Sequence, residues 1–275
     1  MGGVPIGWCD GSSVSYAGRS VKVRFTQTET GATHVITINQ TPGSVSSEGN
    51  NTYYQWGRKD PMLPSTGDND TDKPHYYTNA SFKFNAGGIG EVSVQTSILN
   101  PQVFYNGSPS YNWCSTTYNN LWSADNTVTT ANDDPVVKTI YDPSPVGYHL
   151  PPSNAFTGFT YNGNNVSFSS DFSQFNSPYT SEDDFTTNGG WLFYCNKMDG
   201  AGSYDTAGGT IFYPASGYRI YSSGLLEFVG RGMVFWSTGP YSNDQSLYLS
   251  INSSSVRPLF YNYRSYGFAV RPVQE

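Results

Sequence analysis

The residues that could carry acid–base or metal chemistry are few and widely separated in this sequence. His34, His75 and His149 lie far apart, and each fits a strand face or a turn better than a catalytic base or a metal ligand. The chain also lacks a Gly-x-Ser-x-Gly elbow, a His-Glu-x-x-His motif, a phosphate loop and a dinucleotide fingerprint. We therefore expect no catalytic residue, no metal site and no cofactor.

Two acidic runs need a closer look. Residues 67–73 alternate Asp with polar residues, as calcium loops often do. Lys73 stands where an EF-hand needs Gly and Asn79 where it needs Glu, which excludes an EF-hand and leaves a looser calcium site open. We interpret this run as a solvated turn and residues 182–184 as an exposed charge cluster.

The cysteines do not settle the redox compartment. Cys9, Cys114 and Cys195 are an odd number at wide spacing and form no Cys-x-x-Cys motif. One disulfide with one free thiol and three unlinked buried cysteines both remain open.

Composition excludes several classes of partner. The net charge is −7 and no Lys/Arg cluster occurs, which disfavours nucleic acid and anionic membrane surfaces, because both require a basic face. No apolar stretch approaches the ~20 residues of a membrane-spanning helix. The first residues lack the regions of a signal peptide, so we expect that an upstream leader or domain has been removed.

The C-terminal segment has the composition of a recognition surface. Thirty positions from Ser237 to Tyr266 hold eight Ser, five Tyr and three Asn. Tyr supplies contact area at low entropic cost, and small polar residues adapt their hydrogen bonds. The alternative is an ordinary polar hairpin with exposed Tyr. The expected ligand-binding residues are Trp236, Tyr241, Asn243, Asp244, Tyr248, Asn252, Tyr261, Tyr263 and Arg264.

Periodicity predicts a β- and loop-rich α+β protein with few short helices. Alternating apolar residues at 20–26 and 32–40 predict a β-hairpin, and the polar stretch 42–51 predicts a linker. We place the boundary near residue 46, between an N-terminal β extension (1–46) and a ligand-binding domain (47–275). Residues 65–134 are expected to form long loops.

The second half is expected to contain one short helix and several strands. The helix is predicted over residues 152–159, with Ser153 or Asn154 as its cap. Short runs of β-prone residues predict strands at 166–168, 191–194, 210–213, 233–236, 246–251 and 266–270.

An ordered series of five motifs resembles a known family. The motifs are Tyr-Gln-Trp-Gly-Arg (54–58), Tyr-Asp-Pro-Ser-Pro-Val-Gly-Tyr (141–148), Pro-Ala-Ser-Gly-Tyr-Arg (214–219), Phe-Trp-Ser (235–237) and Tyr-Gly-Phe-Ala-Val-Arg-Pro-Val (266–273). Over roughly residues 51–275 the chain resembles the Fibrobacter succinogenes major paralogous domain family. The resemblance implies a C-type-lectin-like fold, related to the formylglycine-generating enzyme, on cell-surface or secreted proteins of gut Bacteroidetes, some of them pilus-associated. The upstream hairpin resembles the end of an immunoglobulin-like module.

Residues 237–266 also resemble the variable region of proteins diversified by retroelements, which implies either a bacterial adhesin or a phage receptor-binding protein. The reactive-cysteine motif of the related enzymes and the sugar-binding motifs of calcium-dependent lectins are missing. The lectin-like fold that is expected here therefore does not by itself imply a sugar ligand.

These observations favour a non-enzymatic extracellular protein that binds a protein or glycan ligand on another cell or host surface. One alternative is an enzyme of the same fold, either a glycan hydrolase or a cysteine-dependent modifying enzyme. Another is a structural pilus or phage tail-fibre subunit. Ligand identity and oligomeric state are not encoded in any motif of the sequence.

Overall fold

The computed structural model describes residues 19–26, 30–31, 33–40, 52–62, 83–85, 91–101, 103–107, 110–128, 134–195 and 209–275. Strands make up 38% and helices 13%, which confirms a β-rich protein with few short helices. No helix in these ranges has the length and apolarity needed to cross a lipid bilayer.

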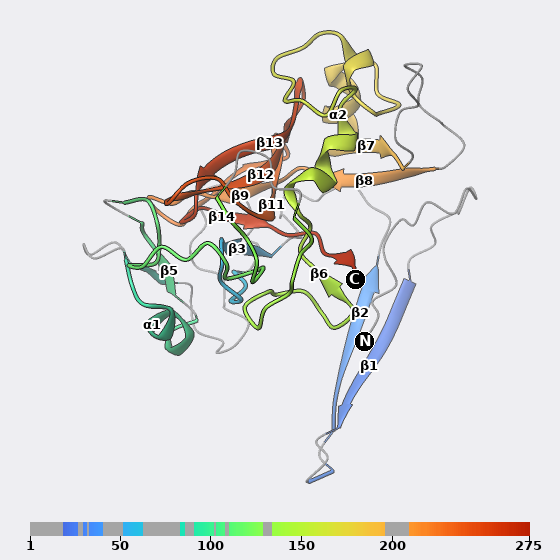
Figure 1. The fold of residues 1–275 in the computed structure, drawn as a ribbon. Helices are drawn as coiled ribbons and strands as arrows, with labels where there is room; N and C mark the ends of the chain where they lie inside the picture. The colour runs from blue at the N-terminus through green and yellow to red at the C-terminus, as the bar shows by residue number, and fades with distance from the viewer. Residues whose placement is uncertain are drawn as a thin grey trace.

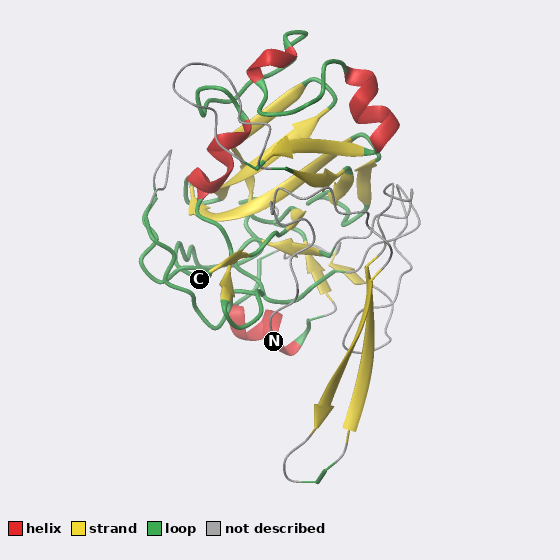
Figure 2. Ribbon diagram, turned by 90° about the vertical axis from the view of Figure 1, so that its right-hand side faces the viewer, coloured by secondary structure: helices red, strands yellow, loops and turns green. Residues whose placement is uncertain are grey.

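The N-terminal hairpin is confirmed. β1 (Arg19–Thr26) and β2 (Thr33–Gln40) pair antiparallel, with Val23 opposite Ile36. Gly31 adopts φ +69° in the connecting turn, a conformation that suits glycine. The hairpin projects from the rest of the molecule in both views (Figures 1 and 2). The predicted boundary near residue 46 lies outside the described residues.

A seven-stranded sheet forms the centre of the molecule (Figure 1). Its path runs β10-β9-β14-β11-β12-β13, and β3 pairs with β14. The strands are β3 (Tyr53–Gln55), β9 (Ser216–Arg219), β10 (Leu226–Val229), β11 (Gly232–Pro240), β12 (Gln245–Asn252), β13 (Ser255–Tyr263) and β14 (Gly267–Ala269).

Smaller elements surround this sheet. The strand pairs are β4 (Lys83–Asn85) with β5 (Val103–Tyr105), β6 (Tyr148–His149) with β15 (Val273–Gln274), and β7 (Gly190–Tyr194) with β8 (Thr210–Pro214). The helices are α1 (Val94–Leu99), α2 (Glu182–Asn188) and the 3₁₀ helices η1 (Ser153–Phe159) and η2 (Phe172–Gln174).

Both faces of the central sheet are buried. Phe235 and Leu249 belong to a core with the aromatic rings of η2, α2 and β7, whereas Trp236 and Tyr248 belong to a second core. Successive side chains of a strand point to opposite faces. Alternate side chains of β11 and β12 therefore point into the two cores. A strand that is buried on both faces appears in the sequence as a continuous apolar run.

Two local expectations were wrong. Pro152, not Ser153 or Asn154, occupies the N-cap of η1 and offers no side-chain bond. The stretch 166–168 makes only a bridge from Val166 to Val256, because Phe168 has φ +53° and interrupts the extended backbone.

The expected charge cluster at residues 182–184 lies in the first turn of α2, where Glu182 and Asp183 are exposed and Asp184 is half-buried. The Asp184 carboxylate accepts hydrogen bonds from the backbone N–H groups of Thr180 and Ser181 at 2.8 and 3.1 Å, and these bonds lower its pKa. Acidic residues also offset the positive end of the helix dipole.

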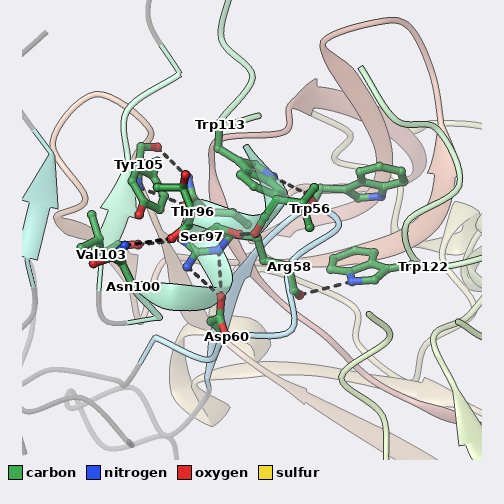
Figure 3. A network of polar contacts seen from close by, with 12 residues as sticks. Trp56, Arg58, Asp60, Thr96, Ser97, Asn100, Val103, Tyr105, Trp113 and Trp122 are labelled. Atoms are coloured by element: carbon green, nitrogen blue, oxygen red, sulfur yellow. Dashed lines mark hydrogen bonds and ion pairs between the residues drawn. The ribbon is translucent and has the colours of Figure 1, made fainter. Parts of the chain in front are cut away.

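The Tyr-Gln-Trp-Gly-Arg motif lies at the centre of the fold. Its buried residues Gln55, Trp56 and Arg58 are here called the central junction, because they connect segments that are distant in the sequence. Figure 3 shows Trp56 and Arg58 beside Trp113 and Trp122. The Gln55 amide donates to the carbonyls of Tyr105 and Ser265, both at 2.7 Å. Three indole N–H groups then donate to backbone carbonyls around the junction: Trp56 to Ser237, Trp113 to Trp56 and Trp122 to Arg58.

Arg58 makes several of the polar contacts of this junction. Its guanidinium donates to Asp60 at 2.8 Å, to the Gln55 side chain at 2.9 Å and to the Val103 carbonyl at 2.7 Å. It also lies 5.1 Å from the ring centroid of Tyr105. Burial lowers the pKa of Arg58, which nevertheless stays protonated because its partners are oxygen acceptors.

Other motifs of the series have structural roles of the same kind. The carboxylate of buried Asp142 accepts from the backbone N–H groups of Ser144 and Leu150, at 2.7 and 2.9 Å, and so fixes the turn that precedes β6. Gly267 lies where an added Cβ would come within 2.9 Å of Arg219 and Phe104. These motifs therefore account for the packing of the fold.

Burial of Tyr248 predicts a loss of stability at alkaline pH. Burial raises the pKa of Tyr248 from 10 to about 12. A raised pKa stabilises the fold below pH 10, and this contribution is lost as the pH rises through 12, because the unfolded chain ionises first. Ionisation of Tyr248 is therefore expected to lower the free energy of unfolding by about 1.4 kcal/mol at pH 11 relative to pH 8.

Urea unfolding at pH 8 and pH 11 tests this expectation. The Tyr248→Phe variant should show a pH-dependent loss smaller than that of the wild type by about 1 kcal/mol. Tyr161→Phe, at an exposed site, is the control and should retain the wild-type pH dependence. An equal loss in wild type and Tyr248→Phe would contradict the assignment.

Candidate ligand-binding surface

Three of the predicted ligand-binding residues are interior residues. Trp236 is fully buried, donates from its indole to the Tyr54 carbonyl at 2.8 Å and packs on Phe268 with ring centroids 4.2 Å apart. Tyr248 packs in the same core, and Arg264 is also buried. Their rings and guanidinium therefore support the fold and do not face solvent.

Asn252 lies away from the other predicted residues. It ends β12 at the turn into β13, where its Oδ1 accepts from the Ser254 N–H at 3.1 Å and the Ser255 hydroxyl at 2.8 Å. Tyr241 precedes the start of the same eight-residue strand. Since a strand rises about 3.3 Å per residue, the two positions are about 25 Å apart.

The five remaining predicted residues lie together. Tyr241, Asn243 and Asp244 form the turn between β11 and β12, while Tyr261 and Tyr263 end β13 beside the start of β12, opposite Leu247 and Gln245. We call these five residues the turn-end surface. Asn243 is exposed and Tyr261 keeps 40% of its surface exposed.

Two tyrosines of the turn-end surface stack face to face. The ring centroids of Tyr241 and Tyr261 are 3.8 Å apart, and the rings are tilted by only 3°. Each ring limits the rotamers of the other, so the pair presents a fixed aromatic edge to solvent.

Tyr263 extends the aromatic group through residues that sequence reasoning missed. It stacks on Tyr111 at 4.2 Å, and Tyr221 lies 5.4 Å from Tyr111 and 5.7 Å from Tyr263. Tyr111 also adopts φ +61°, which is costly for a bulky residue and is typical of constrained sites. Tyr111 and Tyr221 are distant in sequence, and only the general abundance of Tyr hinted at them.

The buried side chain of Arg264 supports the turn-end surface from the interior of the protein. Its guanidinium donates to the Ser242 carbonyl at 2.7 Å and to the Tyr118 carbonyl and the Asn119 side chain, both at 2.8 Å. It also lies 4.4 Å from the ring centroid of Trp56. Burial lowers the pKa of Arg264 to about 10. One side chain thus connects the turn, the neighbouring loop and the central junction.

The turn is also closed by its own polar groups. The Ser242 hydroxyl donates to the Asp244 carboxylate at 2.7 Å and accepts from the Gln245 N–H at 3.2 Å. The Arg264 N–H donates to the Asp244 carbonyl at 2.9 Å. The backbone that carries Tyr241, Asn243 and Asp244 is therefore ordered before any ligand arrives.

Removal of the Arg264 guanidinium should destabilise the protein. Arg264→Met would leave the two carbonyls and the Asn119 side chain without a donor, and we expect a loss of about 3 kcal/mol in the free energy of unfolding. Arg257→Met is the matched control, because Arg257 also lies over an aromatic ring, Phe260 at 4.2 Å, but makes one long hydrogen bond of 3.4 Å to Ser250. This change should cost about 1 kcal/mol. Urea denaturation of both variants measures the difference, and equal losses would refute the positioning role.

The described residues offer little for metal or cysteine chemistry. No group of three His, Cys, Asp or Glu side chains in these ranges could hold a metal ion. Cys114 is a buried free thiol whose pKa is raised chiefly by burial, and Cys195 is disulfide-bonded. The two therefore do not form a pair, and a raised pKa makes Cys114 a poor nucleophile.

Several of the other residues considered from the sequence lie outside the described part. The acidic run 67–73, His75 and Cys9 belong to this group. His149 lies in the short strand β6, and its imidazole contacts the Leu150 carbonyl at 2.7 Å.

No protein-family model, curated protein or solved structure matches this chain. The family resemblance drawn from the five motifs therefore stays a prediction.

Proposed function

We propose that this protein is a non-enzymatic surface adhesin or receptor-binding protein, and that the turn-end surface binds a protein or glycan ligand. The observation that carries the proposal is the grouping of the turn residues Tyr241, Asn243 and Asp244 with two tyrosines at the end of β13. The guanidinium of Arg264 supports the turn from its buried side. Aromatic anchors with adaptable polar neighbours are typical of recognition surfaces.

The side chains of the turn-end surface are held in fixed positions, which favours ligand binding. Ligand affinity is reduced by the entropy lost when side chains and loops become fixed. Here the Tyr241–Tyr261 stack, the Tyr263–Tyr111 stack and the Ser242 hydrogen bonds fix these groups in advance. Much of this entropy is therefore already lost when the protein folds, before a ligand binds.

The finer fold assignment is part of the proposal. We propose a C-type-lectin-like domain, carried on the outer surface of a bacterium or on a phage particle. Support comes from the motifs of the resemblance, four of which supply neighbouring strands: β3, β9, β11 and β14. A shared arrangement of these strands would explain why the motifs occur as an ordered series.

We also propose that a retroelement diversifies the turn-end surface. In that case the positions that vary between copies should be Tyr241, Asn243, Asp244, Tyr261 and Tyr263. The buried residues Trp236, Tyr248 and Arg264 should stay constant, because a change there would damage the core. Neighbouring genomic DNA that encodes a reverse transcriptase and a near-copy of residues 230–275 would support this, whereas variation at the buried positions would oppose it.

Cell binding tests the main proposal. Fluorescent beads coated with the chain would be added to epithelial cells and to a panel of bacteria, and bound beads counted. Wild-type beads should bind at least one cell type. Beads carrying the triple change Tyr241→Ala, Tyr261→Ala and Tyr263→Ala should lose at least about tenfold in binding, since aromatic hot spots dominate such surfaces.

Phe168→Ala is the control, because Phe168 is a highly exposed aromatic residue outside the turn-end surface. Circular dichroism and thermal unfolding would confirm that each variant is folded. Undiminished binding by the folded triple variant would show that the ligand contacts another surface, and failure of wild-type beads on every cell type would count against adhesion.

A further inference from the structure

A second surface, built from the end of η1 and the turn that follows it, has the features of a small ligand site. A hollow of about 320 Å³ lies between Thr157, Tyr161, Asn162 and Gly163. This volume is at the lower end of the range for small-molecule sites. None of these residues belongs to the turn-end surface, so the inference is independent of the proposed function.

The hollow has a rigid wall. Phe159 of η1 stacks on Phe193 of β7 at 4.3 Å, which fixes the helix to the core. The Tyr161 N–H donates to the Gln174 carbonyl at 2.8 Å, and the Thr160 hydroxyl donates to the Asn164 carbonyl at 2.9 Å. The backbone around the hollow is thus held in place by the fold.

The backbone favours glycine on one side of the hollow. Gly163 has φ +77°, and an added Cβ would lie 3.3 Å from the Cβ of Thr157. A side chain at this position would be strained and would narrow the gap to Thr157.

Tyr161 provides an exposed aromatic platform. It keeps 53% of its surface exposed. Polar groups lie beside it. The Asn162 Oδ1 accepts from the Asn164 N–H at 3.1 Å, and the Asn162 amide nitrogen makes no hydrogen bond to the described residues. The Thr157 hydroxyl donates to the Asn154 carbonyl at 2.8 Å and keeps its acceptor capacity.

The lack of charged residues in the segment that lines the hollow indicates the class of ligand. Residues 150–170 contain no Asp, Glu, Lys, Arg or His. A charged ligand would lose hydration here without gaining a counter-charge from the lining residues. An aromatic face next to amide and hydroxyl groups instead suits a neutral molecule with one C–H face and several hydroxyls, because aromatic faces attract weakly positive C–H groups.

We propose that this hollow binds one pyranose unit of a neutral glycan. The sugar's C–H face packs on Tyr161, and its hydroxyl groups bond with Asn162 and Thr157.

Saturation-transfer difference NMR tests the proposal with defined probes. These are the methyl α- and β-pyranosides of glucose, galactose, mannose and N-acetylglucosamine, with N-acetylglycine N-methylamide as a peptide probe. At least one pyranoside should receive saturation, strongest on one C–H face, with a Kd on the order of 1 mM for a ligand of this size. Tyr161→Ala should abolish the signal and Asn162→Ala should weaken it.

Tyr161→Phe keeps the ring and should keep the signal, and Phe168→Ala should leave it unchanged. The triple tyrosine variant of the turn-end surface should also bind normally, which separates this site from the proposed adhesive one. The proposal would be overturned if no pyranoside received saturation, if Tyr161→Ala retained it, or if only the peptide probe bound.

Discussion

Replacing Arg58 by methionine is expected to lower the free energy of unfolding by about 3–5 kcal/mol, the usual cost of breaking a buried ion pair by removing one partner. Methionine fills much of the space of the arginine stem but donates no hydrogen bond. Asp60, the Gln55 Oε1 and the Val103 carbonyl would lose their donor together (Figure 3). Neither Tyr105 nor Trp113 would retain its cationic neighbour.

The adjacent residue provides a matched control for this experiment. Lys59 is exposed and makes one hydrogen bond, to the Ile140 carbonyl at 3.1 Å. Lys59→Met should therefore change the free energy of unfolding by less than about 1 kcal/mol. Urea denaturation of the two variants at pH 7 gives the comparison. If both variants lost a similar amount, the central junction would not be the main polar support of the fold.

The second large effect is expected at Gly217, where alanine should destabilise the protein by at least about 3 kcal/mol. Gly217 has φ +68°, and an added Cβ would lie 2.2 Å from the Glu227 carbonyl oxygen and 2.8 Å from the Val229 nitrogen. Both atoms belong to the backbone of β10, which cannot move without breaking its pairing with β9.

Gly230 separates the steric part of this effect from the conformational part. It has φ +74°, close to that of Gly217, but nothing lies within 4 Å of its added Cβ. Gly230→Ala should then cost only the left-handed conformation itself, about 1–2 kcal/mol. Thermal and urea unfolding of both variants measure the difference, and equal costs would mean that β9 and β10 can separate freely.

Local sequence signals were sufficient for several elements. Alternating apolar residues located the β1–β2 hairpin, and short apolar runs located β7, β8, β11, β12 and β14. These signals work because the period of two in a strand is a property of neighbouring residues.

β13 shows why other elements were not predicted. Pro258 lies inside this strand, and proline lacks the N–H that a central strand needs. Among the strands of the described residues, β13 pairs with β12 alone and lies at one end of the sheet, apart from the single bridge between Val256 and Val166, and its register shifts beside the proline. An edge position tolerates this residue, but strand order is a tertiary property.

The residues of the candidate surface could likewise be predicted only in part from the sequence. Local composition alone shows that a Tyr-, Ser- and Asn-rich segment lies between two β-prone runs near the C-terminus. Burial decided which of its residues can face a ligand. Trp236, Tyr248 and Arg264 point into cores formed by residues more than a hundred positions away, such as Trp56 and Trp122, and no local pattern reports such contacts.

Tertiary structure also brought in residues that the segment lacks. Tyr111 and Tyr221 join Tyr263 because the loop before Trp113 and the turn after β9 meet the end of β13. Composition determined that tyrosine is abundant and charge is scarce. Long-range packing decided which tyrosines stack, which arginine supports them and which five predicted residues share one surface, because these depend on distances between segments that sequence spacing does not encode.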